Sequence, residues 1–82
     1  MKYVVSEHAL FQFAERDISP EEALHCIAHP LSTVRQPLGR TRYARKVKRR
    51  NKYYAIVIVT EKTFSQVTII TGFLSSKIDK YL

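Results

Sequence analysis

The chain has 82 residues, of which 45% are hydrophobic and 26% charged, so we expect one globular domain over residues 1–82 rather than a disordered segment. Its formal net charge of +7 favours a polyanionic partner. The single cysteine, Cys26, excludes an internal disulfide, and the longest apolar run (residues 53–59) is too short to cross a bilayer, which favours a cytoplasmic protein.

Two helices are expected in the first third of the chain. Ser6 is suited to cap a helix that begins at Glu7, because an acid in the first turn complements the helix dipole. Residues 19–22 (Ser-Pro-Glu-Glu) supply an N-cap, an early proline and a capping glutamate for a second helix, which Pro30 ends. The apolar residues expected to face the core from the first helix and its end are Leu10, Phe11, Phe13, Ala14 and Ile18.

The chain after Pro30 is expected to form strands. The predicted strands cover residues 31–36, 41–49, 53–60 and 66–71, with turns at 37–40, 50–52 and 61–65. Gly72 is expected to break the last strand, and residues 73–82 fit either a short strand extension or a helical turn. These elements predict an α+β fold in which two N-terminal helices pack on one face of an antiparallel sheet of about four strands.

A block of basic residues occupies the middle of the chain. Residues 40–50 (RTRYARKVKRR) hold seven Arg or Lys, and no Asp or Glu occurs between Glu22 and Glu61. A field of one sign attracts polyanions, so nucleic acid is the expected partner. A solvated basic face without a ligand would have the same composition.

Strand alternation should divide the charges of residues 41–49 between two faces. One face is expected to carry Arg42, Lys46 and Lys48, and the other Tyr43, Arg45, Val47 and Arg49. The second set holds two apolar members, so we expect it to face the helices and the first set to face RNA. A register shifted by one residue would exchange the faces and bring Tyr43 and Arg45 to the site.

The stretch of residues 6–30 resembles the opening of a small bacterial domain-of-unknown-function family of the RelE/ParE-like toxin superfamily. The matching positions are Ser6, His8, Ala9, Glu15, Arg16, Ile18, Ser19 and Pro30. A looser likeness continues to residues 69–73, which correspond to a family ending Val-Ile-Thr-x-Tyr. Gln12 stands at a usual arginine, Asp17 at a usual glycine and Phe73 at a usual tyrosine.

The resemblance implies a RelE-like domain that acts as a metal-independent endoribonuclease toxin of a toxin–antitoxin or related conflict system. The partners it implies are RNA, free or ribosome-associated, and an antitoxin protein. It implies no cofactor, and no membrane association is expected.

Metal-free cleavage of RNA requires a base, an acid and cations that stabilise the phosphorane. His8 is the preferred acid or base because imidazole titrates near neutrality and because it matches the family motif, although it is equally suited to hold the helix start to the sheet. Arg16 is suited to anchor a phosphate or to pair with a neighbouring acid. The predicted catalytic residues are His8, Arg16, Arg42, Lys46 and Thr71. The predicted nucleic-acid-binding residues are Arg40, Tyr43, Arg45, Lys48, Arg49, Arg50, Lys52 and Tyr54.

Other functions stay open at this stage. Gln12 and Phe73 favour a non-catalytic module that binds nucleic acid or regulates a partner, and the basic face also suits docking on an acidic antitoxin tail. His25 and His29 lie one helical turn apart with no third ligand nearby, so no metal site is predicted. A helix-turn-helix is disfavoured because the second helix starts with two acids and contains no Arg or Lys.

Overall fold

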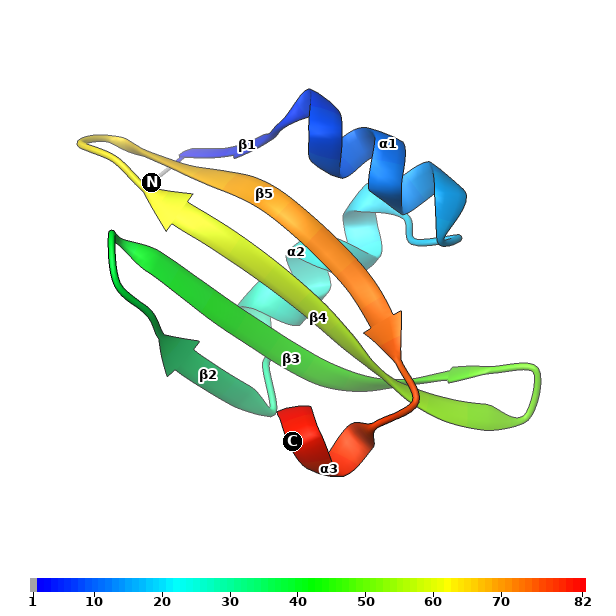
Figure 1. Ribbon diagram of the computed structural model, residues 1–82. Helices are drawn as coiled ribbons and strands as arrows, with labels where there is room; N and C mark the ends of the chain where they lie inside the picture. The colour runs from blue at the N-terminus through cyan, green and yellow to red at the C-terminus, as the bar shows by residue number, and fades with distance from the viewer. Residues whose placement is uncertain (1) are drawn as a thin grey trace.

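A five-stranded mixed sheet carries helices on both of its faces in the computed structural model, which describes residues 2–82 (Figure 1). The elements are β1 (Lys2–Val5), α1 (Glu7–Glu15), α2 (Pro20–Ala28), β2 (Ser32–Arg35), β3 (Arg40–Arg49), β4 (Lys52–Lys62), β5 (Gln66–Ser75) and α3 (Ile78–Tyr81). The strand order is β1-β5-β4-β3-β2. Strands β2 to β5 form an antiparallel meander, and β1 joins its edge parallel to β5.

The predicted four-stranded antiparallel sheet with helices on one face is wrong in two respects. The first is β1, which pairs in parallel with β5 from Lys2↔Gln66 to Val5↔Ile69. The Ser6 amide extends this pairing by donating to the Ile69 carbonyl at 3.1 Å, directly before α1 begins. The second is α3, which packs on the opposite face of the sheet from α1 and α2. The RelE-like arrangement expected from the sequence is therefore corrected to an α+β fold with a five-stranded mixed sheet.

The capping residues produce the two N-terminal helices as predicted. Ser6 accepts a hydrogen bond from the Ala9 amide at 3.1 Å. Ser19 and Glu22 form a reciprocal capping box, in which each side chain accepts from the backbone amide of the other. No helix within residues 2–82 is long and apolar enough to cross a membrane.

The sheet separates two apolar clusters. The larger one lies under α1 and α2, and α2 crosses the far side of the sheet in Figure 1. Its buried members are Ala9, Phe13, Ile18, Ala23, Cys26, Ile27, Ile56, Ile58 and Ile69. The smaller cluster consists of Ala44, Ala55 and Val57, with Phe73 and Tyr81 packed against it. Tyr81 belongs to α3, so this short helix covers only part of the second face.

The predicted apolar stripe of α1 is only partly buried. Ala9 and Phe13 are buried in the helix and Ile18 beyond it, whereas Leu10 and Phe11 are exposed to 46% and 65%. Ala14 is also exposed. The helix packs mainly against β5, near the sheet edge, so a narrow strip of its surface is enough to complete the core.

Gly72 does not break β5, which continues through it to Ser75. Its lack of a side chain lets α1 approach the strand closely. A Cβ at this position would come within 2.8 Å of Ile58 Cδ1 and would also overlap the Phe13 ring.

We predict that Gly72→Ala lowers the free energy of unfolding by about 1–3 kcal/mol, because the added methyl overfills a packed core. Urea denaturation of both proteins measures the difference. Phe13→Leu in the Gly72→Ala background should recover part of the loss, since it vacates the space the methyl needs. Equal stability of Gly72→Ala and the parent would contradict this packing.

Cys26 is buried, and its thiol donates to the Ile56 carbonyl at 3.7 Å. Burial raises the pKa of the Cys26 thiol from 9.0 to about 11, even though the nearby Arg45 charge acts in the opposite direction. A pKa raised by folding means that this group's contribution to stability is complete below pH 9. That contribution is lost as pH rises from 9 to 11, by at most about 3 kcal/mol.

We predict that the folded protein reacts slowly with a thiol-specific disulfide reagent at pH 8, because the thiolate is the reactive form and it is both disfavoured and buried. Reaction should become fast in denaturant. The difference in stability between the parent and Cys26→Ala should narrow between pH 9 and 11. Rapid labelling of the folded chain would show that the thiol is accessible.

Candidate nucleic-acid interface

The pairing of β3 with β4 decides where the basic block points. Tyr43 and Val47 pack against the cluster under α1 and α2. Ala44, on the alternate set of β3 positions, belongs to the cluster on the other face. Arg42, Lys46 and Lys48 share the parity of Ala44 and therefore lie on the face away from α1 and α2.

Two lysines of this face surround an exposed tyrosine. Lys48 pairs directly with Tyr53 across the β3–β4 ladder, and Lys46 is its diagonal neighbour. The ammonium nitrogens lie 4.5 Å (Lys46) and 5.7 Å (Lys48) from the centroid of the Tyr53 ring, within the range of a cation–π contact. Tyr53 is 52% exposed, so its ring remains accessible to a ligand.

A second group of the same kind lies farther along β3. The Arg42 guanidinium carbon is 5.2 Å from the centroid of the Tyr81 ring, and the Lys80 nitrogen is 5.4 Å from it. Phe73 fixes Tyr81 by an edge-to-face contact with centroids 5.6 Å apart. Lys46 lies four positions after Arg42, which places the two groups about 13 Å apart along the strand. We call Arg42, Lys46, Lys48, Tyr53, Lys80 and Tyr81 the basic aromatic face.

Other cations of the block are engaged inside the protein. Arg40 pairs with Glu61 at 3.2 Å, and Arg45 donates to the His29 carbonyl at 2.6 Å. Arg49 donates through one nitrogen to both carboxylate oxygens of Glu22, at 2.5 and 2.6 Å. These three were predicted to bind nucleic acid. In the structure each has a partner within the protein, and the Arg40–Glu61 pair lies exposed at the surface.

Two further residues predicted to bind nucleic acid, Arg50 and Lys52, lie at the tip of the β3–β4 hairpin. Arg50 and Asn51 both have positive φ values, 51° and 66°, and join Arg49 to its pairing partner Lys52. A two-residue loop with two such angles matches the twist of the flanking strands. Arg50 and Lys52 are exposed there, about 30 Å from the opposite end of the β3 ladder by strand geometry.

The uneven distribution of charge along the sequence becomes a difference between layers. Residues 6–29, which contain α1 and α2, hold five acids and one Arg. Residues 30–82, which contain β2 to β5 and α3, hold twelve Arg or Lys and two acids. Those two acids are Glu61, paired with Arg40, and Asp79 on α3. The side of the molecule away from α1 and α2 is therefore the more positive one.

The five predicted catalytic residues do not form one cluster. Arg16 donates to the Gly72 carbonyl at 3.0 Å, and the Thr71 hydroxyl forms a short hydrogen bond with Gln12. Both contacts join α1 to β5. His8 is exposed in the first turn of α1, and its side chain forms no hydrogen bond within residues 2–82.

Arg42 and Lys46 lie on β3, and β4 separates β3 from β5 in the sheet. Arg42, Val59 and Thr71 occupy one row of the sheet, so the Cα atoms of Arg42 and Thr71 are about 10 Å apart. The Thr71 hydroxyl is nevertheless turned to α1 by its bond to Gln12. The structure thus splits the predicted set into a pair at the α1–β5 contact, two cations on β3 and a separate histidine.

The residues predicted from the sequence to bind nucleic acid include Tyr54 and not Tyr53. Tyr54 pairs with Val47, so it lies on the face of α1 and α2, where it lines a hollow with Asp17 and Arg50. The signal was available in the hairpin: if Arg49 pairs with Lys52, then Lys48 must pair with Tyr53. Tyr81 and Lys80 carried no such signal, because nothing in the sequence fixed how residues 73–82 return to the sheet.

No metal site is evident among the described residues. The rings of His25 and His29 are 4.9 Å apart, but within residues 2–82 no group of three or more His, Cys, Asp or Glu side chains is placed to hold an ion.

Comparisons with known proteins identify no relative. Searches against models of protein families, curated proteins and solved structures found no match to this chain. The resemblance of residues 6–30 to a toxin family therefore stays a prediction, and the function must be inferred from the geometry described above.

Proposed function

We propose that this protein binds single-stranded RNA on the basic aromatic face. The observation that carries the proposal is the exposed ring of Tyr53, which the β3–β4 register places opposite Lys48 and diagonal to Lys46. Proteins that bind single strands combine cations that follow the phosphates with aromatic rings on which bases stack. A single strand is the expected form because its bases are free to leave their own stack and meet a protein ring.

The rigid sheet supplies the positioning. Lys46 and Lys48 have exposed side chains that can turn from the Tyr53 ring to neighbouring phosphates while a base takes their place on the ring. The Arg42–Tyr81 group, about 13 Å away, provides a second phosphate and base contact for the same strand. An RNA ligand would place the protein in the cytoplasm.

Cleavage of RNA by this protein is a separate hypothesis. The toxin-like ribonuclease predicted from residues 6–30 needs an acid or base close to the cations that hold the phosphate. His8 lies on α1, whereas Lys46 and Arg42 lie on β3 and face away from that helix. Binding without cleavage therefore fits the arrangement better than the predicted ribonuclease does.

The double variant Lys46→Ala/Lys48→Ala tests the phosphate contacts. We expect weaker binding of a 5′-hydroxyl RNA oligonucleotide and a shallower salt dependence. The slope of log K against log salt should fall by about 1.4, because each phosphate contact on a single strand contributes about 0.7. Fluorescence anisotropy over a series of salt concentrations measures it. Lys46→Arg/Lys48→Arg is the matched control and should keep the slope, and an unchanged slope in the alanine variant would refute the assignment.

Tyr53→Ala tests the stacking contact. Loss of one stacked base should cost about 1–3 kcal/mol, or roughly a 5- to 150-fold weaker affinity, with no change in the salt slope. Tyr53→Phe keeps the ring and should bind like the parent. Gel analysis of the recovered RNA distinguishes binding from cleavage. If the parent cuts the RNA and His8→Ala does not, the ribonuclease hypothesis is established. Equal RNA affinities of Tyr53→Ala and the parent would show that the Tyr53 ring does not contact the RNA.

A further inference from the structure

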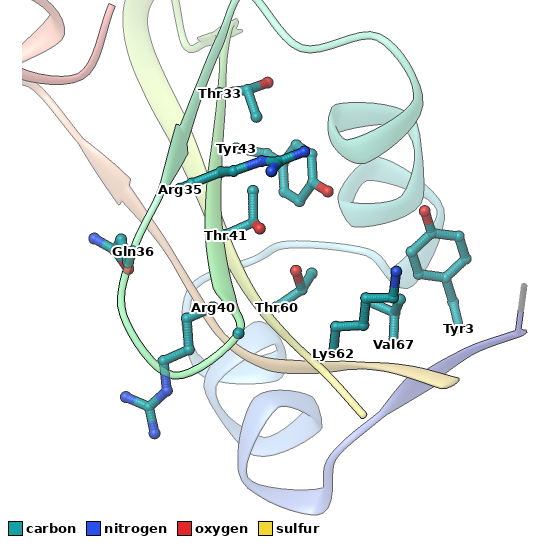
Figure 2. Close-up of a pocket in the computed structure, with 11 residues that line it drawn as sticks. Tyr3, Thr33, Arg35, Gln36, Arg40, Thr41, Tyr43, Thr60, Lys62 and Val67 are labelled. Atoms are coloured by element: carbon teal, nitrogen blue, oxygen red, sulfur yellow. The ribbon is translucent and has the colours of Figure 1, made fainter. Parts of the chain in front are cut away.

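A cavity of about 420 Å³ opens at the end of the sheet where the β2–β3 and β4–β5 turns meet (Figure 2). Its walls include Tyr43 and Thr41 of β3, and Tyr43 also packs against the cluster under α1 and α2. The cavity therefore lies on the opposite side of the sheet from the basic aromatic face. Neither α1 nor α2 extends far enough to fill this end of the sheet.

Two cations contribute to the cavity, and none of its lining residues is Asp or Glu. Arg35 of β2 and Lys62 of β4 form no salt bridge within residues 2–82. Figure 2 shows their charged ends on different sides of the same space, with Lys62 directed toward Tyr3 and Arg35 lying beside Tyr43. Arg40 also borders the cavity, but its guanidinium points away from it and pairs with Glu61.

Hydroxyl groups complete the polar lining. Those of Tyr43, Thr41 and Thr60 are directed toward the cavity in Figure 2. Thr60 is the one polar residue buried in the core within residues 2–82, at 2% exposed.

We infer that this cavity binds a phosphomonoester, such as the phosphate of a mononucleotide. A phosphomonoester carries close to two negative charges at neutral pH, which the Arg35 and Lys62 charges match. Hydroxyl donors from Thr41, Thr60 and Tyr43 suit its remaining oxygens. The volume falls within the range of small-molecule sites, and the tyrosine rings offer surfaces for a base or sugar.

Calorimetric titration with AMP tests the inference. We expect AMP to bind the parent and adenosine, which lacks the phosphate, not to bind. Lys62→Ala or Arg35→Ala should weaken AMP binding roughly 10- to 150-fold, the effect of losing a charge-assisted hydrogen bond. Lys77→Ala, which removes the same charge beside α3, is the matched control and should bind AMP like the parent. Circular dichroism confirms that each variant is folded.

The source of the phosphomonoester is decided with two RNA oligonucleotides that differ only in a 5′-phosphate or a 5′-hydroxyl. Tighter binding of the phosphorylated strand, lost in Lys62→Ala, supports the inference and identifies a strand terminus as the ligand. Equal binding of the two strands, together with Lys62-dependent AMP binding, supports it with a free mononucleotide as the ligand. The inference is overturned if AMP does not bind at millimolar concentration, or if it binds Lys62→Ala and the parent equally. The outcome of this test does not decide the RNA-binding proposal, because that proposal depends on residues of the other face of the sheet.

Discussion

The register between β3 and β4 is the constraint on which the rest of the structure depends. Ten consecutive pairs, from Arg40↔Glu61 to Arg49↔Lys52, hold these strands together, and the Arg50–Asn51 turn closes them. A shift of one residue would send Tyr43 and Val47 into solvent and bury Lys46. The hydrophobic demand of the core thus decides which cations reach solvent together. The positions of Lys48 and Tyr53 follow from the same pairing.

Charged and polar groups at the two ends of α2 bind basic residues of β3. Glu22 caps α2 and also receives the Arg49 guanidinium, so one carboxylate fixes the helix start and binds the helix to β3. At the other end of α2, Arg45 donates to the His29 carbonyl. Arg45 and Arg49, the β3 cations that point toward α2, are therefore fixed by contacts with it, whereas Arg42, Lys46 and Lys48 point away and form no salt bridge within residues 2–82. A block that looks uniform in sequence becomes two populations with different roles.

Local signals in the sequence predicted the helices and most of the strands. Ser6, Ser19 and Glu22 act within one helical turn, and strand alternation acts between neighbours, so both can be read from a short window. The parallel β1–β5 pair joins residues 2–5 to residues 66–69, and no local pattern reports a contact over that separation. The same reason left residues 73–82 undecided between a strand extension and a helical turn, because Tyr81 contacts residues of β3 and β4 far from it in sequence.

The functional sites show the same difference between local signals, which the sequence reveals, and long-range contacts, which it does not. Alternation correctly separated Arg42, Lys46 and Lys48 from Tyr43 and Val47, and it placed Arg49 on the side of the helices. It could not identify Glu22 as the partner of Arg49, because the two residues lie 27 positions apart in the sequence. The cavity is less accessible still to sequence reasoning. Its lining comes from residue 3, from residues 33–43 and from residues 60–67, which only the completed sheet brings together.

The contact between α1 and β5 covers part of a sheet edge that β1 leaves open. Strand β1 covers β5 only as far as Ile69, and the backbone beyond that point would otherwise offer a free row of donors and acceptors. An open row of this kind recruits strands from other molecules and promotes aggregation. Arg16 occupies the Gly72 carbonyl, and Gln12 stands at Thr71. Arg16, predicted to act on RNA, thereby occupies a backbone carbonyl that an added strand would need.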